Sequence, residues 1–387
     1  MRLLFTLLAL AILLLSGCGE QGTAGEEDVS REQDSGDAAS LDFPEIDYWL
    51  MITDSIGIEL GDSNYVFGTI VSAQVMPDGN IAVADMMKAR INIYTPEGQY
   101  VTSVGRSGSG PGEYQMLASM SVTDQGGFIV PDAMGGKVNF YDSELNFTRE
   151  ISGFFPSPPV MVISAGDDFV GQMPAWNEDE DQMMTGMALA RWSETAEEDV
   201  LYQENLVPFD MNDMNTMAET AIIFAVDRDE DVFLTHYDTE NYLVTCLDRD
   251  GNELWTIEED YPRARKSQED IDIEREFVRS RMLAGGAPPA MAESYEPDEY
   301  KSMIANLSVD SMNRLWVMSG LYDGSVFRVY DGDTGEFLFT AALRTDEYHE
   351  NVAPFITKHG IVAFDAVSDE WHRVYTIAPE DPSLFAE

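Results

Sequence analysis

The sequence predicts an all-β fold assembled from repeated units of four antiparallel strands. In residues 78–104, apolar side chains such as Ile81, Val83 and Ile91 alternate with small or polar ones, the period-two pattern of strands with one packed face. Asp-Gly and Glu-Gly pairs separate these runs, where glycine allows tight hairpin turns. Degraded copies of the unit follow at a spacing of roughly 40 to 50 residues, the period of propeller blades.

Six such units can be recognised. Clear copies follow the first one at residues 122–142, 225–251 and 307–335, and weaker copies occupy residues 159–192 and 352–377. The last unit ends at Ile377 without an outer strand, whereas Met51–Leu60 is strand-like and precedes the first complete unit. The N-terminal strand should complete the last blade, because closure removes exposed sheet edges. We therefore predict a six-bladed β-propeller of four-stranded antiparallel blades over residues 46–380, closed by an N-terminal strand.

One stretch, residues 266–284, breaks the strand rhythm. Ser267 and Asp270 can form a capping pair at its start. Its apolar residues form a loose helical stripe, namely Ile271, Phe277, Val278 and Met282. The GGAPPA of residues 285–290 would end a helix and return the chain toward the fifth blade. We expect one inserted helix at about residues 266–284.

A glycine-rich run at residues 105–114, GRSGSGPGEY, carries a family resemblance. It is similar to the GxxGxGPGE signature of a family of bacterial six-bladed propeller lipoproteins, and the repeats resemble NHL-type six-bladed propellers. The resemblance covers roughly residues 50–378, and departs from the family in the third blade and in long insertions. The same run could cradle a phosphate, but no Gly-Lys-Ser/Thr follows and Pro111 removes a donor. We interpret it as a crossover between blades.

The first 18 residues have the anatomy of a lipoprotein signal peptide. Arg2 supplies a positive start, residues 3–15 an apolar core, and Leu15 to Cys18 a lipobox. The apolar run is shorter than the ~20 residues of a membrane-spanning helix. Cys18 is expected to carry a lipid that anchors the protein to the cell envelope. Residues 19–45 are expected to be a disordered acidic tether.

Gly19 follows the lipobox cysteine where some lipoproteins have aspartate. By resemblance to Gram-negative lipoproteins, this favours the outer membrane, on its periplasmic or cell-surface side. The net charge of −49 arises from 71 acidic and 22 basic residues. Such a composition is halophile-like. The alternative is that the acidic surface binds cations or basic partners. In either case the acidic surface would repel nucleic acid, so we expect no nucleic-acid partner. We also expect the protein to be a monomer.

Two kinds of cluster invite metal hypotheses. Short acidic stretches recur at residues 227–231, 248–251 and 331–333, and calcium loops gather alternating carboxylates in this way. None completes the twelve-residue loop, and aspartate before glycine also serves a hairpin turn, so calcium stays an open alternative. Thioether spacing typical of Cu(I) sites occurs at Met183, Met184 and Met187 and at Met211, Met214 and Met217. Methionine is more often core filling, so copper is not expected.

No residue set for catalysis can be recognised. The histidines are scattered, and the predicted inner strands show Gln74, Ser121 and Asn306 but no set of carboxylates for a channel metal. Cys246 lies in a strand pattern and is expected to be buried and inert. The sequence thus favours a non-catalytic binding or scaffold propeller whose partner is an unknown envelope protein or small ligand. The alternative is a hydrolase or lyase acting in the central channel, by fold analogy alone.

Strand parity predicts which face of the propeller binds. The turns at Gly79, Gly98, Gly251 and Gly335 are short and share one face. The long insertions share the other, and are expected at residues 173–186, 203–220 and 258–303. Loops on a rigid scaffold concentrate binding residues, which predicts a ligand site on the insertion face near the channel mouth. We expect Arg106, Trp176 and Tyr261 to bind there; alternatively, the loops merely cap the channel.

Overall fold

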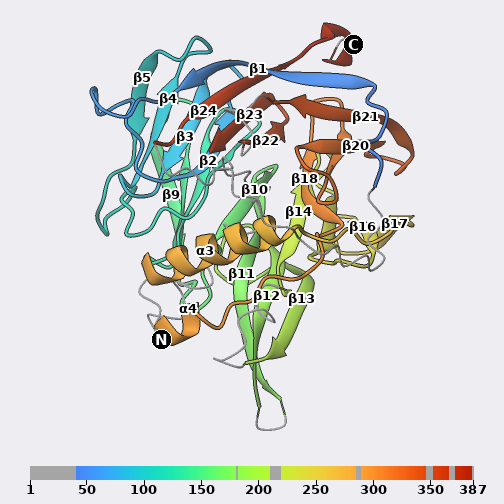
Figure 1. Ribbon diagram of the computed structural model, residues 1–387. Helices are drawn as coiled ribbons and strands as arrows, with labels where there is room; N and C mark the ends of the chain where they lie inside the picture. Colours follow the sequence, from blue (N-terminus) through green and yellow to red (C-terminus); the bar gives the residue numbers. More distant parts are fainter. Residues whose placement is uncertain are drawn as a thin grey trace.

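The computed structural model describes residues 41–179, 182–209, 219–284, 289–345, 352–365 and 371–385. Within them the chain forms an all-β propeller of antiparallel sheets with an inserted helix (Figure 1). No helix in these residues is long and apolar enough to cross a membrane. The predicted signal peptide and lipidated Cys18 lie outside the described residues, as does most of the predicted tether.

Four of the five sheets contain four strands each, in sequence order. The first contains β2 (Ile70–Val75), β3 (Ile81–Asp85), β4 (Arg90–Tyr94) and β5 (Tyr100–Val104). The second contains β6 (Ser121–Val122), β7 (Phe128–Asp132), β8 (Lys137–Tyr141) and β9 (Phe147–Ser152). The third contains β10 (Met161–Ala165), β11 (Asp168–Asp179), β12 (Gln182–Trp192) and β13 (Val200–Pro208). The fourth contains β14 (Ile222–Val226), β15 (Val232–His236), β16 (Tyr242–Leu247) and β17 (Glu253–Glu259).

The fifth sheet has eight strands, in the order β18-β19-β20-β21-β1-β24-β23-β22. One half contains β18 (Ile304–Val309), β19 (Arg314–Ser319), β20 (Val326–Asp331) and β21 (Phe337–Arg344). The other contains β22 (Val352–Thr357), β23 (Gly360–Asp365), β24 (Val374–Pro379) and β1 (Tyr48–Ile56). β1 pairs antiparallel with β24 and parallel with β21. An N-terminal strand therefore completes the last three strands, which is the pairing that the sequence predicts.

The bounds of β1 differ from the predicted strand at residues 51–60. β1 begins at Tyr48 and ends at Ile56, where Gly57 takes a φ of 137° and turns the chain. Leu50 is fully buried between the two halves of the eight-stranded sheet, whereas Leu60 is 83% exposed. One hydrophobic cluster contains Leu50 of β1, Trp316 of β19 and Tyr375 of β24. β1 is therefore held to both halves of this sheet by side-chain packing as well as by backbone hydrogen bonds.

The short turns form as the sequence predicts. Gly79 lies between β2 and β3 with a φ of 86°, a conformation that glycine adopts without steric cost. Asp78 Oδ1 accepts a hydrogen bond from the Asn80 backbone N–H at 3.0 Å, which fixes the turn. The equivalent turn between β16 and β17 repeats this scheme, because Asp248 Oδ1 accepts the Asp250 N–H at 2.9 Å.

Buried aspartates tie the links between sheets to the sheets themselves. Asp85, at the end of β3, is fully buried and accepts backbone N–H groups of Gly68 at 2.8 Å and Lys88 at 3.1 Å. Asp132, at the end of β7, does the same for Met116 at 2.8 Å and Gly135 at 3.0 Å. A buried carboxylate is tolerated because these donors replace water. The aspartate at the end of the second strand therefore has the same structural role in both sheets.

The inserted helix is α3 (Gln268–Ala284), which falls within the stretch predicted to be helical. Its start is a capping box, as expected, because the Asp270 N–H donates to Ser267 Oγ at 3.0 Å and the Ser267 N–H donates to Asp270 Oδ2 at 3.0 Å. Val278 and Met282 are buried. A second short helix, α4 (Pro289–Ala292), follows, and a 3-10 turn, η1 (Pro382–Phe385), packs Phe385 against Trp316.

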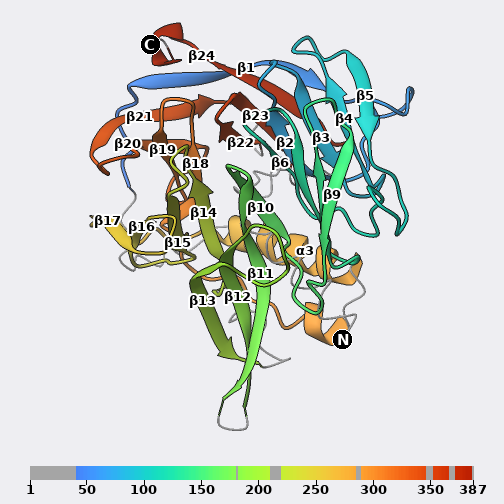
Figure 2. The ribbon, with the colours of Figure 1, turned by 180° about the vertical axis from the view of Figure 1, so that it is seen from behind.

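The insertion predicted at residues 173–186 does join the second and third strands of the third sheet, but as paired strand and not as a loop. β11 and β12 pair continuously from Phe169–Trp192 to Asp179–Gln182, so this stretch is a long hairpin. It extends away from the other sheets (Figure 2). Continuous pairing satisfies peptide groups that a loop would leave to water. The insertion predicted at residues 203–220 is in part strand as well, because β13 continues to Pro208.

Candidate functional site

The first strands of the repeated units surround a cavity of about 220 Å³ on the axis of the propeller. These strands are β2, β6, β10, β14, β18 and β22. For comparison, a cavity of about 150 Å³ is enough to bind benzene. Gln74, Ser121 and Asn306 line the cavity, which confirms that the sequence placed them correctly on inner strands.

Both ends of the cavity are lined by apolar and polar side chains. Each inner strand begins at a link from the preceding unit, so a residue's place along its strand gives its depth in the channel. Near the strand starts, the face of the insertions, the lining includes Met86, Met116 and Met161. Near the strand ends, the face of the short turns, it includes Lys358 and His359. Polar side chains also occur near the strand starts, as at Ser119, and apolar ones near the strand ends, as at Val226 and Val309.

Some polar side chains of the lining hold neighbouring sheets together. Gln74 Nε2 on β2 donates to the Met120 carbonyl at 2.8 Å, and its Oε1 accepts the Val122 N–H at 2.9 Å. The Ser164 N–H on β10 donates to Ser121 Oγ at 2.9 Å. These bonds fix three adjacent inner strands, so that part of the wall is rigid and preformed, as small-molecule sites usually are.

Other polar atoms of the lining have no partner. Ser119 and Ser164 are 8% and 4% exposed, and neither hydroxyl finds a hydrogen bond within the described part of the chain. The same is true of Nε2 of His359. A buried polar atom without a partner costs about 1–3 kcal/mol, and such atoms are rare in native proteins. All three residues line the cavity, but these atoms themselves are buried away from its surface.

The cavity is electrically close to neutral. Among the described residues that line it there is no aspartate or glutamate. Lys358 Nζ lies 3.2 Å from Asp124 Oδ1, which joins the β22–β23 turn to the β6–β7 turn at the face of the short turns. Burial lowers the pKa of His359, so its imidazole is uncharged at pH 7. The nearly neutral lining of the cavity thus differs from the chain as a whole, whose net charge is −49.

The structure places the three predicted binding residues apart. Arg106 lies between β5 and β6, exposed, with Nε 2.8 Å from Glu113 Oε1. Trp176 is on β11 of the long hairpin and is 40% exposed. Tyr261 follows β17, is half-buried, and donates its hydroxyl to Glu259 Oε2 at 2.7 Å. None of the three is among the described residues that line the cavity.

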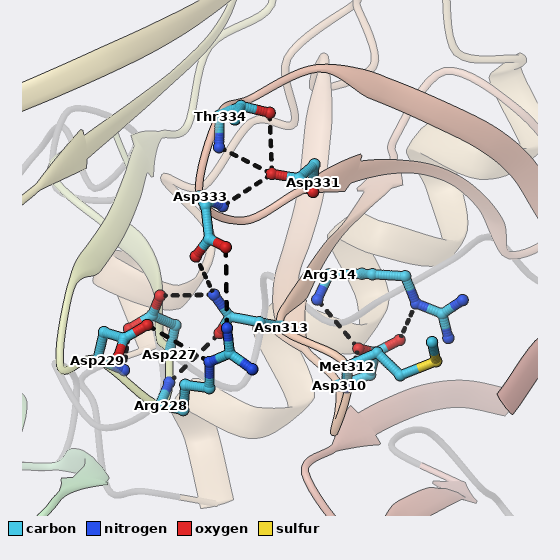
Figure 3. A network of polar contacts seen from close by, with 10 residues as sticks. All are labelled: Asp227, Arg228, Asp229, Asp310, Met312, Asn313, Arg314, Asp331, Asp333 and Thr334. Carbon is cyan, nitrogen blue, oxygen red and sulfur yellow. Dashed lines mark hydrogen bonds and ion pairs between the residues drawn. The ribbon is translucent and has the colours of Figure 1, made fainter. Parts of the chain in front are cut away.

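Two of the three acidic stretches converge between the fourth and fifth sheets (Figure 3). Carboxylate oxygens of Asp227, Asp229 and Asp333 lie within 4.8 Å of one another. Asn313 Nδ2 donates to Asp227 Oδ2 at 3.1 Å and to Asp333 Oδ1 at 2.8 Å, and Arg228 pairs with Asp229 at 3.4 Å. These hydrogen bonds and this ion pair hold the carboxylates in place, so we interpret the cluster as a structural link between the two sheets.

The remaining candidates behave as ordinary structural residues. Cys246 is fully buried, and burial raises the pKa of its thiol, as expected of an inert cysteine. Met187 packs in the core, whereas Met183 is exposed. The other methionine cluster, at Met211, Met214 and Met217, lies outside the described residues.

Comparison with known proteins gives one family match and several distant structural likenesses. Residues 62–160 match the family described as "6-bladed beta-propeller". Among solved structures, gluconolactonase from Xanthomonas campestris is 12% identical, with 81% of this chain and 87% of that chain covered and a TM-score of 0.42. Virginiamycin B lyase from Staphylococcus aureus is 9% identical, with 86% and 99% covered and a TM-score of 0.42. Regucalcin from Agrobacterium tumefaciens is 8% identical, with 85% and 94% covered and a TM-score of 0.44.

Likenesses of this size say nothing about activity. No curated protein matches the chain significantly.

Proposed function

We propose that this protein is a six-bladed propeller lipoprotein that binds a small molecule in its channel and does not transform it. For the blade count, each half of the eight-stranded sheet repeats the antiparallel order of the other four sheets. Counted as two blades, the halves bring the total to six, the number in the description of the matching family.

One observation carries the binding proposal: the six inner strands enclose a preformed cavity of about 220 Å³, lined mostly by apolar side chains with a few polar ones, as small-molecule sites usually are. Gln74, Ser119 and Ser164 are among the polar residues of this lining. The proposed site is the channel itself, built from the inner strands, and its lining reaches both faces of the propeller.

The lining also supports binding without catalysis. A hydrolase or lyase needs a general base and a general acid, or a metal, within reach of the substrate. Here the carboxylate near His359 is Asp124, which is paired with Lys358 and is not among the described residues that line the cavity. The hydrolase or lyase alternative therefore has fewer supporting residues than the binding role.

The proposal places the propeller at the outer membrane, anchored through a lipid on Cys18. The lipobox and the acidic, glycine- and serine-rich tether support this placement. The high acidity is, on this proposal, an adaptation to salt that keeps the surface soluble. An envelope protein could contact the exposed insertion face, where Arg106 and Trp176 stay candidates for that contact.

The test is capture of a ligand by the full chain from an extract of the producing cells. Protein purified in mild detergent is incubated with the extract, washed and denatured, and released molecules are identified by mass spectrometry. The variant Ala118→Phe fills part of the cavity, and Ala378→Phe places the same side chain on β24, away from it.

We expect one compound to be released from the wild type and from Ala378→Phe but not from Ala118→Phe. Its mass should be unchanged after prolonged incubation with fresh protein. Conversion of the compound to a product would support the enzyme instead. Equal release from all three proteins would place the site elsewhere.

A further inference from the structure

The sequence contains two Asn-x-Ser/Thr triplets, one starting at Asn146 and ending at Thr148 and one starting at Asn306 and ending at Ser308. This triplet is the acceptor of N-linked glycosylation, in which an oligosaccharide is attached to the asparagine amide. An acceptor has to lie on the surface, where the transferring enzyme can reach it. Asn306 is half-buried on β18 and lines the channel, and Ser308 is 8% exposed, so the fold withholds the second triplet.

The first triplet is accessible. Asn146 is exposed in the turn between β8 and β9, on the face of the short turns. Its Nδ2 donates to Asp142 Oδ2 at 3.2 Å and to Glu144 Oε2 at 3.4 Å. These bonds lie at the surface, where water or an enzyme can replace them at little cost.

Thr148, the third member of the triplet, is exposed on β9. Its hydroxyl donates to the Phe140 carbonyl at 3.1 Å. β9 is the outermost strand of its sheet and pairs with β8 alone among the described strands. An enzyme can therefore reach Asn146 and Thr148 along a sheet edge without opening the core.

A second turn of the same design lies in the fourth sheet. Asp248 Oδ1 accepts the Asn252 backbone N–H at 2.8 Å, and Asn252 Nδ2 donates to Asp248 Oδ2 at 2.9 Å. The residue two places later is Leu254, so this turn has the asparagine without the triplet. The geometry of the turn thus accounts for asparagine at both places, whereas it does not require Thr148.

We propose that Asn146 is a site of N-linked glycosylation. The inference goes beyond the binding role of the channel and rests on the proposed envelope location, because the sugar is transferred outside the cytoplasm. The donor is a lipid-linked oligosaccharide diphosphate. The Asn146 Nδ2 lone pair forms a bond to the anomeric carbon, whose bond to the diphosphate oxygen breaks. The lipid diphosphate leaves with that electron pair, and one Nδ2 proton passes to solvent.

The test is mass spectrometry of the full protein from the producing cells, separated into membrane and cytoplasmic fractions. Trypsin cleaves after lysine and arginine, and releases residues 138–149, 250–263 and 302–314 as three separate peptides. Each peptide contains one of the three asparagines compared here, so each site is read independently. We expect an oligosaccharide on Asn146, and none on Asn252 or Asn306.

Three variants separate the triplet from the turn. Thr148→Ala keeps Asn146 and its turn, and should lose the oligosaccharide, whereas Thr148→Ser keeps the triplet and should retain it. Leu254→Thr completes a triplet in the fourth sheet at a side chain that is 50% exposed, and should add an oligosaccharide at Asn252.

A bare Asn146 in protein recovered from the membrane fraction would overturn the inference and leave the proposed location intact. An oligosaccharide that persists on Asn146 in Thr148→Ala would also overturn it, because the triplet would then play no part. A bare Asn146 in protein found only in the cytoplasmic fraction would overturn the inference together with the location.

Discussion

Ile52 of β1 lies directly opposite Ile377 of β24 in an antiparallel pair, so strands from the two ends of the described chain close one sheet. The same strand pairs in parallel with β21, and this bond between the last two units is why they form one eight-stranded sheet. Ring closure thus depends on side chains of β1 that face the core.

Leu50→Ala should destabilise the protein by about 2–5 kcal/mol, because it leaves a cavity among the strands that β1 joins. Met51→Ala is the control, since Met51 is next in the same strand but 36% exposed. Urea unfolding followed by tryptophan fluorescence measures both. Equal, small losses for the two variants would mean that β1 contributes little to closure.

A buried ion-pair network joins the third and fourth sheets. Arg191 is 2% exposed and contacts Asp168 and Glu230, which also pair with Arg249 at 2.7 and 2.9 Å. Arg191→Ala leaves the two carboxylates with one partner, so we expect a loss of about 3–5 kcal/mol of unfolding free energy.

The matched control for this network is Arg106→Ala, which breaks an arginine–carboxylate pair whose arginine side chain is 80% exposed. That change should cost less than about 1 kcal/mol, since exposed pairs contribute little. The same urea titration compares the two variants. A loss at Arg106 as large as that at Arg191 would contradict the role of burial.

Asp231, beside the cluster of Asp227, Asp229 and Asp333, predicts that the stability of the protein depends on pH. Burial, and then repulsion by Asp227 and Asp229, raises the pKa of Asp231 to about 6 from its usual 3.8. The folded state therefore binds this proton more tightly than the unfolded state. The penalty for the charged carboxylate is present above pH 6 and is relieved as pH falls from about 6 toward about 4.

Asp231→Asn should accordingly raise the melting temperature at pH 7, and this gain should shrink at pH 5. Asp250→Asn, in the exposed β16–β17 turn, removes one charge without this burial and is the control. A gain at Asp231 that is the same at both pH values would show that the pKa is not raised.

Cys18→Ala should release the protein from membranes, because the lipid on this residue is the proposed anchor. Membrane fractionation of cells expressing the wild type and the variant measures this. Ser16→Ala, which keeps a small residue in the lipobox, should still pellet with membranes. A variant at Cys18 that pellets like the wild type would place the anchor elsewhere.

Local patterns in the sequence predicted much of the fold. The turn at Asp78–Gly79, the capping pair of α3 and the inner-strand positions of Gln74, Ser121 and Asn306 each depend on neighbours in sequence. The sequence did not predict the hairpin of β11 and β12, because both strands continue beyond the length of the repeated strand pattern.

The candidate site was harder to predict, because it depends on closure of the ring. Ser119, Ser164 and His359 come from three different units, and no local pattern shows that their polar atoms are unpartnered. The convergence of Asp227 with Asp333 is of the same kind. The sequence predicts Tyr261 as an aromatic binding residue, and the structure packs its ring against Tyr242, with 5.2 Å between centroids.

The most direct test of the channel as a binding site is a crystal structure of the protein in complex with the compound captured from cell extract. We expect difference density for the molecule between the inner strands, in contact with lining residues such as Ser119 and Ser164. A channel that holds only water, while the compound occupies another site or none, would contradict the account.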